Sequence, residues 1–299
     1  MSSSSSKSSP APTNVLDLRS FSKQGDFPKS SMDAPFGWPG GKRSLIKTLL
    51  PLIPQHRAYV EVFSGSAKLL FAKAPSEWEV LNDINGDVVN FFRVAKHRPS
   101  ALAELLETDV VASERFRDLL RQSGSTEIRE TENEVERALR FSYLTWNSFG
   151  CMGRTFASAA IQQLGSKPAL RRSLASVNML LEQTADRLAH VLVEDRDFAQ
   201  CIDRNDCPDT FFYLDPPYTN FAPNSRYKPL GERVPELFNL LAHIQGKFLM
   251  SFDDAPIIRK LARQNKMTVR TVKTSYSLAR GTHQHKRELL IANYSLKLR

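Results

Sequence analysis

The chain has 299 residues, of which 41% are hydrophobic, so it can bury a core in one large domain with an insertion or a small second domain. Forty-one basic against 32 acidic residues give a net charge of +9, which favours a polyanionic partner. Three cysteines without a Cys-x-x-Cys pair argue against a disulfide framework or a zinc knuckle and fit a reducing cytoplasm. We expect neither a signal peptide nor a membrane helix, because no apolar run approaches the ~20 residues that a span needs.

The beginning of the chain predicts a tail followed by an anion site. Residues 1–33 are expected to be a disordered, low-complexity tail, because the serine-rich start is too polar to offset the entropy of ordering. Gly40 and Gly41 then allow a ligand to approach the backbone, and the stretch to Leu52 has helical apolar spacing. A glycine turn before a helix suits an anion, and Lys42 adds a positive charge. The turn lacks the P-loop spacing, so we predict no triphosphate site.

The next elements predict the front half of a nucleotide-binding α/β unit. A strand, a tight turn, a helix and a second strand are expected at residues 58–63, 64–66, 67–74 and 78–81. Asp83 follows the second strand, 18 residues past Gly65, where a carboxylate can accept both hydroxyls of a ribose bound over the first turn. Alone, Asp83 could equally cap a helix over residues 85–97. Together the features favour an adenosine-bearing cofactor, and the missing G-x-G-x-x-G pattern argues against a dinucleotide.

Residues 98–189 lack the strand pattern and predict an inserted helical region. Residues 131–134 fit a capping box, with apolar positions following along one helical face, and residues 167–189 predict another helix. The loop at 147–156 between them is small, polar and glycine-rich, which is typical of a contact surface. The alternative is a plain connection between helices whose Phe149 and Phe156 belong to the core.

Strands return after the insertion. They are predicted at residues 191–193, 211–214, 247–252, 267–272 and 288–294, with helices at 231–244 and 255–264. Seven strands with interleaved helices predict a doubly wound α/β sheet. His283 and His285 lack a third ligand of suitable spacing, so we predict no metal site and interpret them as part of a solvated or phosphate-facing loop.

The segment Phe211–Tyr218, Phe-Phe-Tyr-Leu-Asp-Pro-Pro-Tyr, carries the strongest chemical signal. Its first four residues predict a buried strand, and Asp215 follows at the carboxyl end, where open α/β sheets bind ligands. Pro216 and Pro217 have no backbone N–H groups, so they do not compete for the hydrogen-bond acceptors of a bound ligand. A carboxylate, two carbonyls and the ring of Tyr218 suit a planar ring that bears an amino group. By itself, the segment is also compatible with a strand that ends in a Pro-Pro turn.

The ordered set of motifs resembles the DNA adenine-N6 methyltransferases that contain an Asp-Pro-Pro-Tyr motif, the Dam-like group. The segments that carry the resemblance are residues 38–42, 59–65, 82–85, 90–93 and 212–218, with 288–294 similar to the family's closing strand. The resemblance implies a Rossmann-like S-adenosylmethionine methyltransferase fold with a seven-stranded mixed sheet. In it, residues 34–97 and 190–299 form the catalytic domain, and the helical insertion at 98–189 recognises the target.

The implied reaction is transfer of a methyl group from S-adenosylmethionine to the exocyclic amino group of a flipped-out adenine in duplex DNA. The resemblance assigns catalysis to Asp215, Pro216, Pro217 and Tyr218. It assigns donor binding to Trp38, Gly40, Gly41, Lys42, Glu61, Phe63, Gly65, Asp83, Asp197, Phe198 and Asp215. Lys42 suits the methionine carboxylate and Asp83 the ribose. The chain departs from the family pattern at Val62, where proline is usual, and at Ser66, where a second glycine is usual.

DNA contacts are predicted at Asn147 and Arg154, because their loop is polar and glycine-flanked and the protein is basic. Three alternatives stay open: a non-catalytic DNA-binding protein on the same fold, a cytosine-N4 methyltransferase and an RNA adenine methyltransferase. A metal-dependent nuclease using Asp197 and Asp215 is disfavoured, because no lysine-bearing strand has useful spacing. We expect a cytoplasmic protein encoded by a bacterium or a phage. The recognised sequence, a restriction partner and the choice between monomer and weak dimer stay open.

Overall fold

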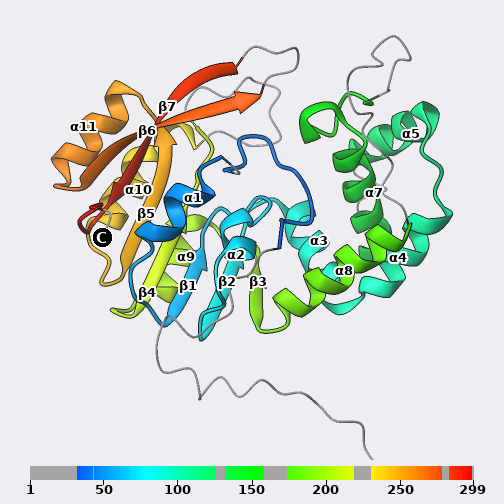
Figure 1. The fold of residues 1–299 in the computed structure, drawn as a ribbon, viewed down its shortest axis with the longest axis horizontal. Coiled ribbons are helices and arrows are strands. Elements are labelled where there is room, and N and C mark those ends of the chain that lie inside the picture. Colours follow the sequence, from blue (N-terminus) through cyan, green and yellow to red (C-terminus); the bar gives the residue numbers. More distant parts are fainter. Residues whose placement is uncertain are drawn as a thin grey trace, which may run out of the picture.

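The centre of the protein is a seven-stranded mixed sheet with the strand order β3-β2-β1-β4-β5-β7-β6 (Figure 1). The computed structural model describes residues 32–42, 44–125, 132–157, 174–218, 230–277 and 283–297. The strands are β1 Ala58–Glu61, β2 Trp78–Asn82, β3 Val191–Glu194, β4 Thr210–Leu214, β5 Lys247–Asp253, β6 Thr268–Ser277 and β7 His283–Ala292. The first five strands are mutually parallel and β7 is antiparallel to both of its neighbours, which confirms the predicted α/β class.

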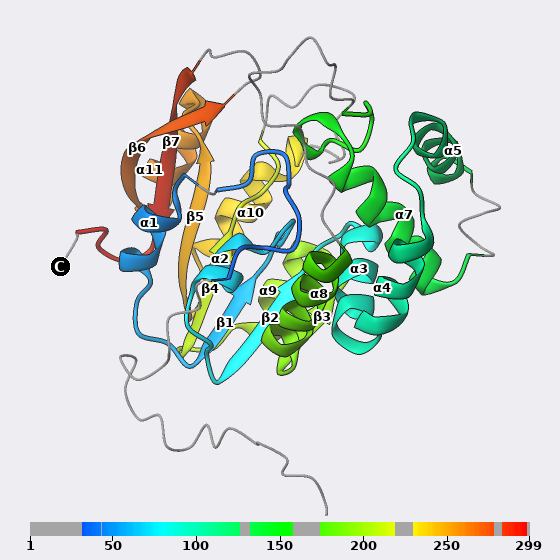
Figure 2. The same ribbon diagram turned by 45° about the vertical axis from the view of Figure 1, so that its right-hand side comes forward.

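Helices cover both faces of the sheet and extend beyond its β3 edge (Figures 1 and 2). The α-helices are α1 Ile46–Leu49, α2 Lys68–Ala72, α3 Gly86–His97, α4 Pro99–Thr108, α5 Ser113–Ser123, α7 Glu134–Trp146, α8 Leu174–Leu188, α9 Phe198–Asn205, α10 Val234–Leu241 and α11 Pro256–Gln264. Short 3₁₀ turns are η2 Leu50–Leu52, η3 Phe149–Cys151 and η5 Gly231–Arg233. No helix in the described ranges combines the length and apolar character that a membrane crossing requires.

The chain reverses direction across the sheet between β1 and β4, its topological switch point. From β1 it passes outward to β2 and β3, and it then returns to pair β4 with the free side of β1. The register aligns Glu61 with Tyr213, so the turn after β1 and the Asp-Pro-Pro segment after β4 leave the same edge. In open α/β sheets this carboxyl edge is where ligands bind.

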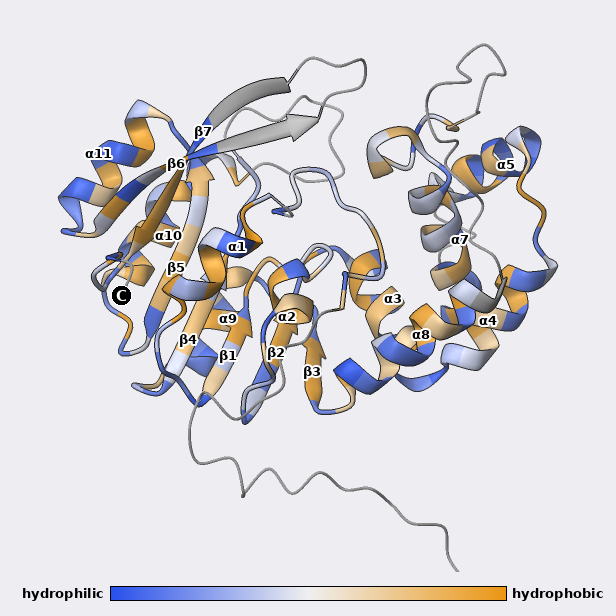
Figure 3. Cartoon of the chain, in the orientation of Figure 1, coloured by the Kyte–Doolittle hydropathy of each residue, from blue (hydrophilic) through white to orange (hydrophobic). Residues whose placement is uncertain are grey.

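Buried strands divide their side chains between two hydrophobic cores. In β4, Phe211 and Tyr213 face the core under α1, α2 and α3, whereas Phe212 and Leu214 face the core under α9, α10 and α11. Burial on both faces explains why this strand is continuously apolar rather than alternating. Figure 3 shows the same pattern, with mostly hydrophobic colours along the central strands and hydrophilic residues on the outer side of α11.

An aromatic cluster joins the first described residues to the helical insertion. Phe36 is 1% exposed and lies edge-on to Phe91 of α3 and Phe141 of α7, with ring centroids 5.0 and 5.1 Å apart. Trp38 lies 5.7 Å from Phe36 and 5.9 Å from Phe141. Edge-to-face aromatic contacts of this kind fix ring orientation as well as burying apolar area. The segment that carries Phe36 and Trp38 is therefore packed against α3 and α7.

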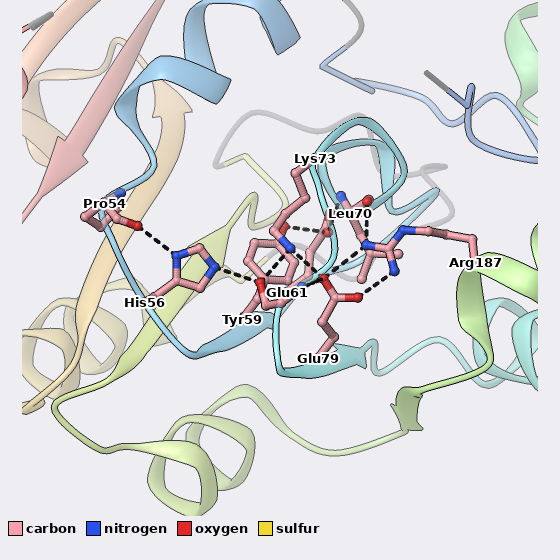
Figure 4. Close-up of polar contacts among 9 residues, drawn as sticks. Pro54, His56, Tyr59, Glu61, Leu70, Lys73, Glu79 and Arg187 are labelled. Atoms are coloured by element: carbon pink, nitrogen blue, oxygen red, sulfur yellow. Dashed lines mark hydrogen bonds and ion pairs between the residues drawn. The ribbon is translucent and has the colours of Figure 1, made fainter. Parts of the chain in front are cut away.

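A buried polar network fastens α8 to β2 and α2 (Figure 4). Arg187 of α8 donates to Glu79 of β2 at 2.5 and 3.0 Å and to the Leu70 carbonyl of α2 at 2.9 Å. Glu79 also pairs with the buried Lys73 at 2.5 Å. Burial raises the pKa of Glu79, but Lys73 and Arg187 outweigh it, so the pKa lies below its ordinary value. The carboxylate is thus fully partnered, as a buried charge must be.

Two details of the predicted elements are wrong. Helix α7 is capped by Asn133, whose side chain accepts from the N–H groups of Val135 and Glu136, rather than by the predicted box at 131–134. His283 and His285 belong to β7 and not to a loop, because β6 and β7 continue to pair beyond the apolar segments that the sequence reveals. Residues 1–31 of the predicted tail and residues 167–173 of the predicted helix lie outside the described residues. The insertion boundaries at 98 and 189 stay predictions.

Candidate active site

The Asp-Pro-Pro-Tyr segment emerges at the carboxyl edge of β4 and meets Lys42 there. Lys42 Nζ lies 2.7 Å from Asp215 Oδ1 and 4.0 Å from Glu288 Oε2 of β7, and it donates to the Gly40 carbonyl at 3.1 Å. The Lys42 side chain is 5% exposed and that of Asp215 is 22% exposed. The structure therefore brings together the glycine turn and the acidic motif that the sequence predicted separately.

Tyr218 lies beside the same cation. Its ring stacks on Phe252 of β5 with centroids 5.7 Å apart and an interplanar angle of 23°, and Lys42 Nζ lies 4.7 Å from its centroid. Pro216 and Pro217 are buried between Asp215 and Tyr218. Because one face of the ring is backed by Phe252, the Tyr218 ring is held in a fixed orientation relative to the Asp215 carboxylate.

Ser251 of β5 completes the surroundings of Asp215, and sequence reasoning missed it. Its hydroxyl donates to Asp215 Oδ1 at 3.0 Å and lies 3.2 Å from the Tyr213 hydroxyl. Ser251 is 0% exposed, so its hydrogen bond fixes one carboxylate oxygen without competition from water. A serine within the apolar run 247–252 was the available signal, since a buried hydroxyl needs a partner.

The turn after β1 is held together by Asp83. Gly65 N donates to Asp83 Oδ2 and Asn85 N donates to Asp83 Oδ1, each at 2.8 Å. Burial raises the pKa of Asp83 to about 6, against the lowering effect of these two N–H donors. Gly65 has φ +48°, which glycine adopts without strain. Asn85, not Asp83, caps α3 by accepting from Asp87 N, so the helix-cap alternative for Asp83 is wrong.

A cavity of about 810 Å³ lies between the carboxyl edge of the sheet and the helical insertion. On the sheet side, Asp83 and the predicted donor residues Asp197 and Phe198 line it. Ile84 also lines it and is 68% exposed, an apolar contact that the sequence prediction did not include. The insertion contributes Arg137, Arg140, Phe141, Leu144, Gly153 and Arg154. Apolar and cationic groups thus face the carboxylates of the sheet across this cavity.

A smaller cavity of about 30 Å³ leads to the catalytic candidates, and Phe63 lines both cavities. The predicted residues in this second lining are Trp38, Gly41, Lys42, Glu61, Gly65 and Asp215. Glu61 accepts from Tyr59 Oη at 2.8 Å and from Leu70 N at 3.2 Å (Figure 4). Burial raises the pKa of Glu61 to about 8, so the carboxyl is largely protonated at neutral pH.

Three predicted residues have structural partners of their own. Asp197 caps α9 and pairs with Arg233 at 2.6 Å, and this arginine holds the pKa of Asp197 below its ordinary value. The Arg233 guanidinium also lies 4.3 Å from the ring centroid of Phe198. Asn147 donates to the Tyr143 carbonyl at the end of α7 and does not line the large cavity. Of the two loop residues predicted to contact DNA, only Arg154 is exposed and faces this cavity.

The two phenylalanines of the loop at 147–156 differ: one fits the interpretation of the loop as a contact surface, and the other fits the interpretation of the loop as a helix connection with core residues. Phe149 is 57% exposed, as a contact surface requires. Phe156 packs on Phe116 of α5 with ring centroids 5.5 Å apart, as a core residue does. An isolated bridge between Ser148 and Phe156 closes the loop.

The residues of the two cavities fit S-adenosylmethionine. A buried lysine suits a carboxylate, an aspartate at the end of the second strand suits ribose hydroxyls, and exposed apolar side chains suit a purine. Sheet order, switch point and this donor set together define a methyltransferase of the Rossmann-like class.

Comparison with known proteins identifies the family. Residues 38–277 match the D12 class N6 adenine-specific DNA methyltransferases, and the chain belongs to that family. It is 27% identical over 222 residues to Type II methyltransferase M1.LlaDCHI of Lactococcus lactis subsp. cremoris, covering 72% of this chain and 70% of that protein. It is 30% identical over 120 residues to the DNA adenine methylase of Vibrio cholerae serotype O1, covering 39% of this chain and 40% of that protein. A match of 27% over 124 residues to the DNA N-6-adenine-methyltransferase of Escherichia phage P1 covers 16% of that protein.

Proposed function

We propose that the chain transfers a methyl group from S-adenosylmethionine to the N6 amino group of an adenine that is flipped out of duplex DNA. The observation that carries the proposal is the convergence of Asp215, Tyr218 and Lys42 at one point of the carboxyl edge. A carboxylate beside a fixed aromatic face suits a flat, amino-bearing base. A lysine beside them suits the carboxylate of the methyl donor.

The donor is assigned to the two cavities, whose linings share Phe63. Lys42 would bind its carboxylate, and Trp38, Phe63 and Gly65 would surround its methionine end. Asp83 would accept the ribose hydroxyls, with Ile84 offering apolar surface to its base. Gly40, Gly41, Glu61, Asp197 and Phe198 are proposed as supporting donor-site residues. When bound, S-adenosylmethionine supplies an electrophilic methyl group on a sulfonium sulfur.

The residues of this chain would act on the nucleophile. The adenine amino nitrogen is a poor nucleophile, because its lone pair is delocalised into the ring. Asp215 and the Pro216 carbonyl would accept its two N–H groups and favour a more tetrahedral nitrogen with an available lone pair. Pro217 supports the turn without adding a competing N–H donor. Tyr218 would hold the ring by stacking, so alignment and electrostatics supply the rate.

The DNA would lie against the insertion and the carboxyl edge. A base inside a duplex is out of reach, so it must be flipped at a cost of about a few kcal/mol. The net charge of +9 favours phosphate contacts that offset this cost and make binding salt-sensitive. Arg154 is proposed as a DNA contact because it is exposed at the cavity on the insertion side, and Asn147 as a supporting residue of its loop. The bacterial and phage relatives support a cytoplasmic protein encoded by a bacterium or a phage.

The test is single-turnover transfer of a labelled methyl group to duplex DNA, followed by mass analysis of the modified nucleosides. We expect N6-methyladenine. N4-methylcytosine, or label in RNA only, would replace the proposal with one of the related methyltransferases. Donor crosslinking without any transfer would indicate an inactive DNA-binding protein. Sequencing of methylated DNA from expressing cells would then identify the recognised sequence.

A further inference from the structure

The β6–β7 hairpin continues past the rest of the sheet. The pairing of β5 with β7 ends at Asp253 and Glu288, whereas β6 and β7 pair for five more residues, from Lys273 opposite Arg287 to Ser277 opposite His283. Five pairs correspond to about 17 Å of two-stranded backbone. A two-stranded hairpin is at best marginally stable by itself, and no third strand of the described residues pairs with this extension. We call these five pairs the ribbon.

The ribbon rises from the edge that carries the active site. Since β7 is antiparallel to β5, its first residues lie beyond the carboxyl ends of the parallel strands. Glu288, the first residue after the ribbon, is 1% exposed and lies 4.0 Å from Lys42 Nζ. Figures 1 and 2 show the described ends of β6 and β7 on one side above the sheet and α5 and α7 on the other. Anything bound over the carboxyl edge therefore has the ribbon on one flank and the insertion on the other.

From the start of β6 to the end of the ribbon, the charged residues are all basic. Residues 268–287 include five lysines and arginines and no aspartate or glutamate. Lys273 and Arg287 are both exposed and lie directly opposite each other, although like charges at paired positions destabilise a sheet. Arg287 lies 3.5 Å from Asp254, a carboxylate that Arg259 already engages at 2.6 Å. A polyanion is the ligand that offsets this repulsion, and the phosphates of a nucleic-acid backbone suit paired cations of this kind.

We propose that the ribbon binds the phosphate backbone of the DNA duplex on the flank of the target base opposite the helical insertion. The inference rests on the proposed function and adds a second contact to it. The two flanking contacts would straddle the active site, so that the duplex is held on both sides while one base leaves the stack. Contacts to phosphate position a duplex but carry no direct sequence information. The ribbon would therefore raise the affinity for duplexes of every sequence by the same factor.

The test compares the double variant Lys273→Ala/Arg287→Ala with wild type in DNA binding across a range of salt concentrations. Losing two phosphate contacts should lower the slope of log affinity against log salt by about 1.8, equivalent to about a tenfold smaller loss of affinity between 50 and 200 mM salt. Cognate and random duplexes should weaken by the same factor. Turnover at saturating DNA and calorimetric donor affinity should stay at wild-type values, since neither residue touches the active site.

The matched control is Lys260→Ala/Arg263→Ala, which removes two exposed cations from α11, the helix that leads into β6. It should keep the wild-type slope.

An unchanged slope for the ribbon variant, with an unchanged melting temperature, would overturn the ribbon contact while leaving the methyltransferase proposal intact. Loss confined to the cognate duplex would also overturn it, because base recognition rather than phosphate binding would then be lost. A ribbon that instead pairs with a second copy would give a concentration-dependent dimer that the variant abolishes, again contradicting the proposal. A wild-type protein that neither binds nor methylates duplex DNA would refute the proposed function itself.

Discussion

Lys42 Nζ lies 2.7 Å from Asp215 Oδ1 and 4.7 Å from the centre of the Tyr218 ring, so one cation contacts both groups proposed to hold the target base. The backbone fixes its position, because the Lys42 carbonyl accepts from Leu45 N and Ile46 N as α1 begins. The same cation is proposed to bind the donor carboxylate. Donor binding and the state of Asp215 are therefore linked through one side chain.

Replacing this cation should weaken donor binding. Lys42→Met keeps the stem but removes the charge, and loss of a charged hydrogen bond costs about 1.5–3 kcal/mol, or roughly ten- to over a hundredfold in affinity. Calorimetry with S-adenosylmethionine measures the change. Lys47→Met, an exposed position on α1, is the control and should bind the donor normally. Wild-type affinity in a folded Lys42→Met protein would remove Lys42 from the donor site.

Asp83 should matter for the donor and not for DNA. Asp83→Ala removes the carboxylate proposed for the ribose, so donor affinity should fall by about 1.5–3 kcal/mol while DNA affinity changes less. Because Asp83 also holds Gly65 N and Asn85 N, Asp83→Asn is the companion variant that retains an acceptor for the turn. Asp195→Ala removes an exposed carboxylate at the end of β3 and should behave as wild type. Calorimetric donor affinity that is unchanged in Asp83→Ala would end the ribose assignment.

Most of the strands could be predicted from the sequence, because burial on both faces requires continuous apolar runs. The ribbon could not, since its residues are polar and their pairing depends on two segments that meet only in the folded hairpin. Thr131 and Asn133 are both good capping residues, and local pattern alone does not decide between them. The structure shows that Asn133 caps α7.

The candidate site was predictable where one residue follows the end of a strand, as Asp83 and Asp215 do. Contacts across strands were not predictable. Ser251 reaches Asp215 because β4 and β5 pair with Leu214 opposite Met250, a register that neither segment reveals separately. The insertion side of the large cavity, including Arg137 and Arg140, depends likewise on how α7 packs on α3.

The DNA affinities of an Arg154 variant should show whether this residue contacts phosphate or recognises a base. Arg154→Ala should leave donor binding unchanged and reduce DNA affinity. If the guanidinium contacts phosphate, all sequences should weaken together; if it contacts a guanine edge, discrimination should fall by about 1–3 kcal/mol at one position. Arg121→Ala, on the exposed side of α5, is the control. Wild-type affinity for both cognate and random duplexes would exclude Arg154 from the interface.

Glu61 should make stability depend on pH near neutrality. Its pKa is raised by burial from 4.5 to about 8, so the folded protein keeps a proton that the unfolded chain releases. The contribution of Glu61 to the free energy of unfolding is then fully present below pH 4.5, and it is lost as the pH rises towards 8. Burial raises the pKa of Asp83 to about 6 and lowers that of His56 from 6.5 to about 4, so the interval from pH 6.5 to 8 isolates Glu61 from both.

Glu61→Gln keeps an acceptor for Tyr59 and stays neutral at every pH. Its melting temperature should therefore fall less than that of wild type between pH 6.5 and 8, while the exposed Glu107→Gln should follow wild type. Parallel melting curves for wild type and Glu61→Gln across this interval would show that Glu61 is ionised in the folded protein.

Variants of the residues around the proposed target base should affect the rate of methyl transfer to different extents, according to the chemistry of each side chain. Asp215→Asn keeps the size of the side chain but replaces a carboxylate acceptor with a neutral amide, so single-turnover methyl transfer should fall steeply while folding survives. Ser251→Ala leaves the carboxylate in place but removes one of the two contacts to Asp215 Oδ1, the other being Lys42 Nζ, so it should lower the rate constant with little change in donor affinity. Equal losses of donor affinity and rate in Ser251→Ala would indicate a general packing defect rather than positioning of Asp215.

Tyr218 should act through its ring. Tyr218→Phe keeps the stacking face against Phe252 and should retain most activity, whereas Tyr218→Ala should lose about 1–3 kcal/mol of base stacking. That loss corresponds to roughly a ten- to hundredfold slower effective turnover. Single-turnover transfer of a labelled methyl group to adenine-containing duplex DNA measures all these variants on one scale. Wild-type transfer by Asp215→Asn would mean that Asp215 does not accept a hydrogen bond from the amino group of the target base. Activity lost equally in Tyr218→Phe and Tyr218→Ala would assign the role of Tyr218 to its hydroxyl instead of its ring.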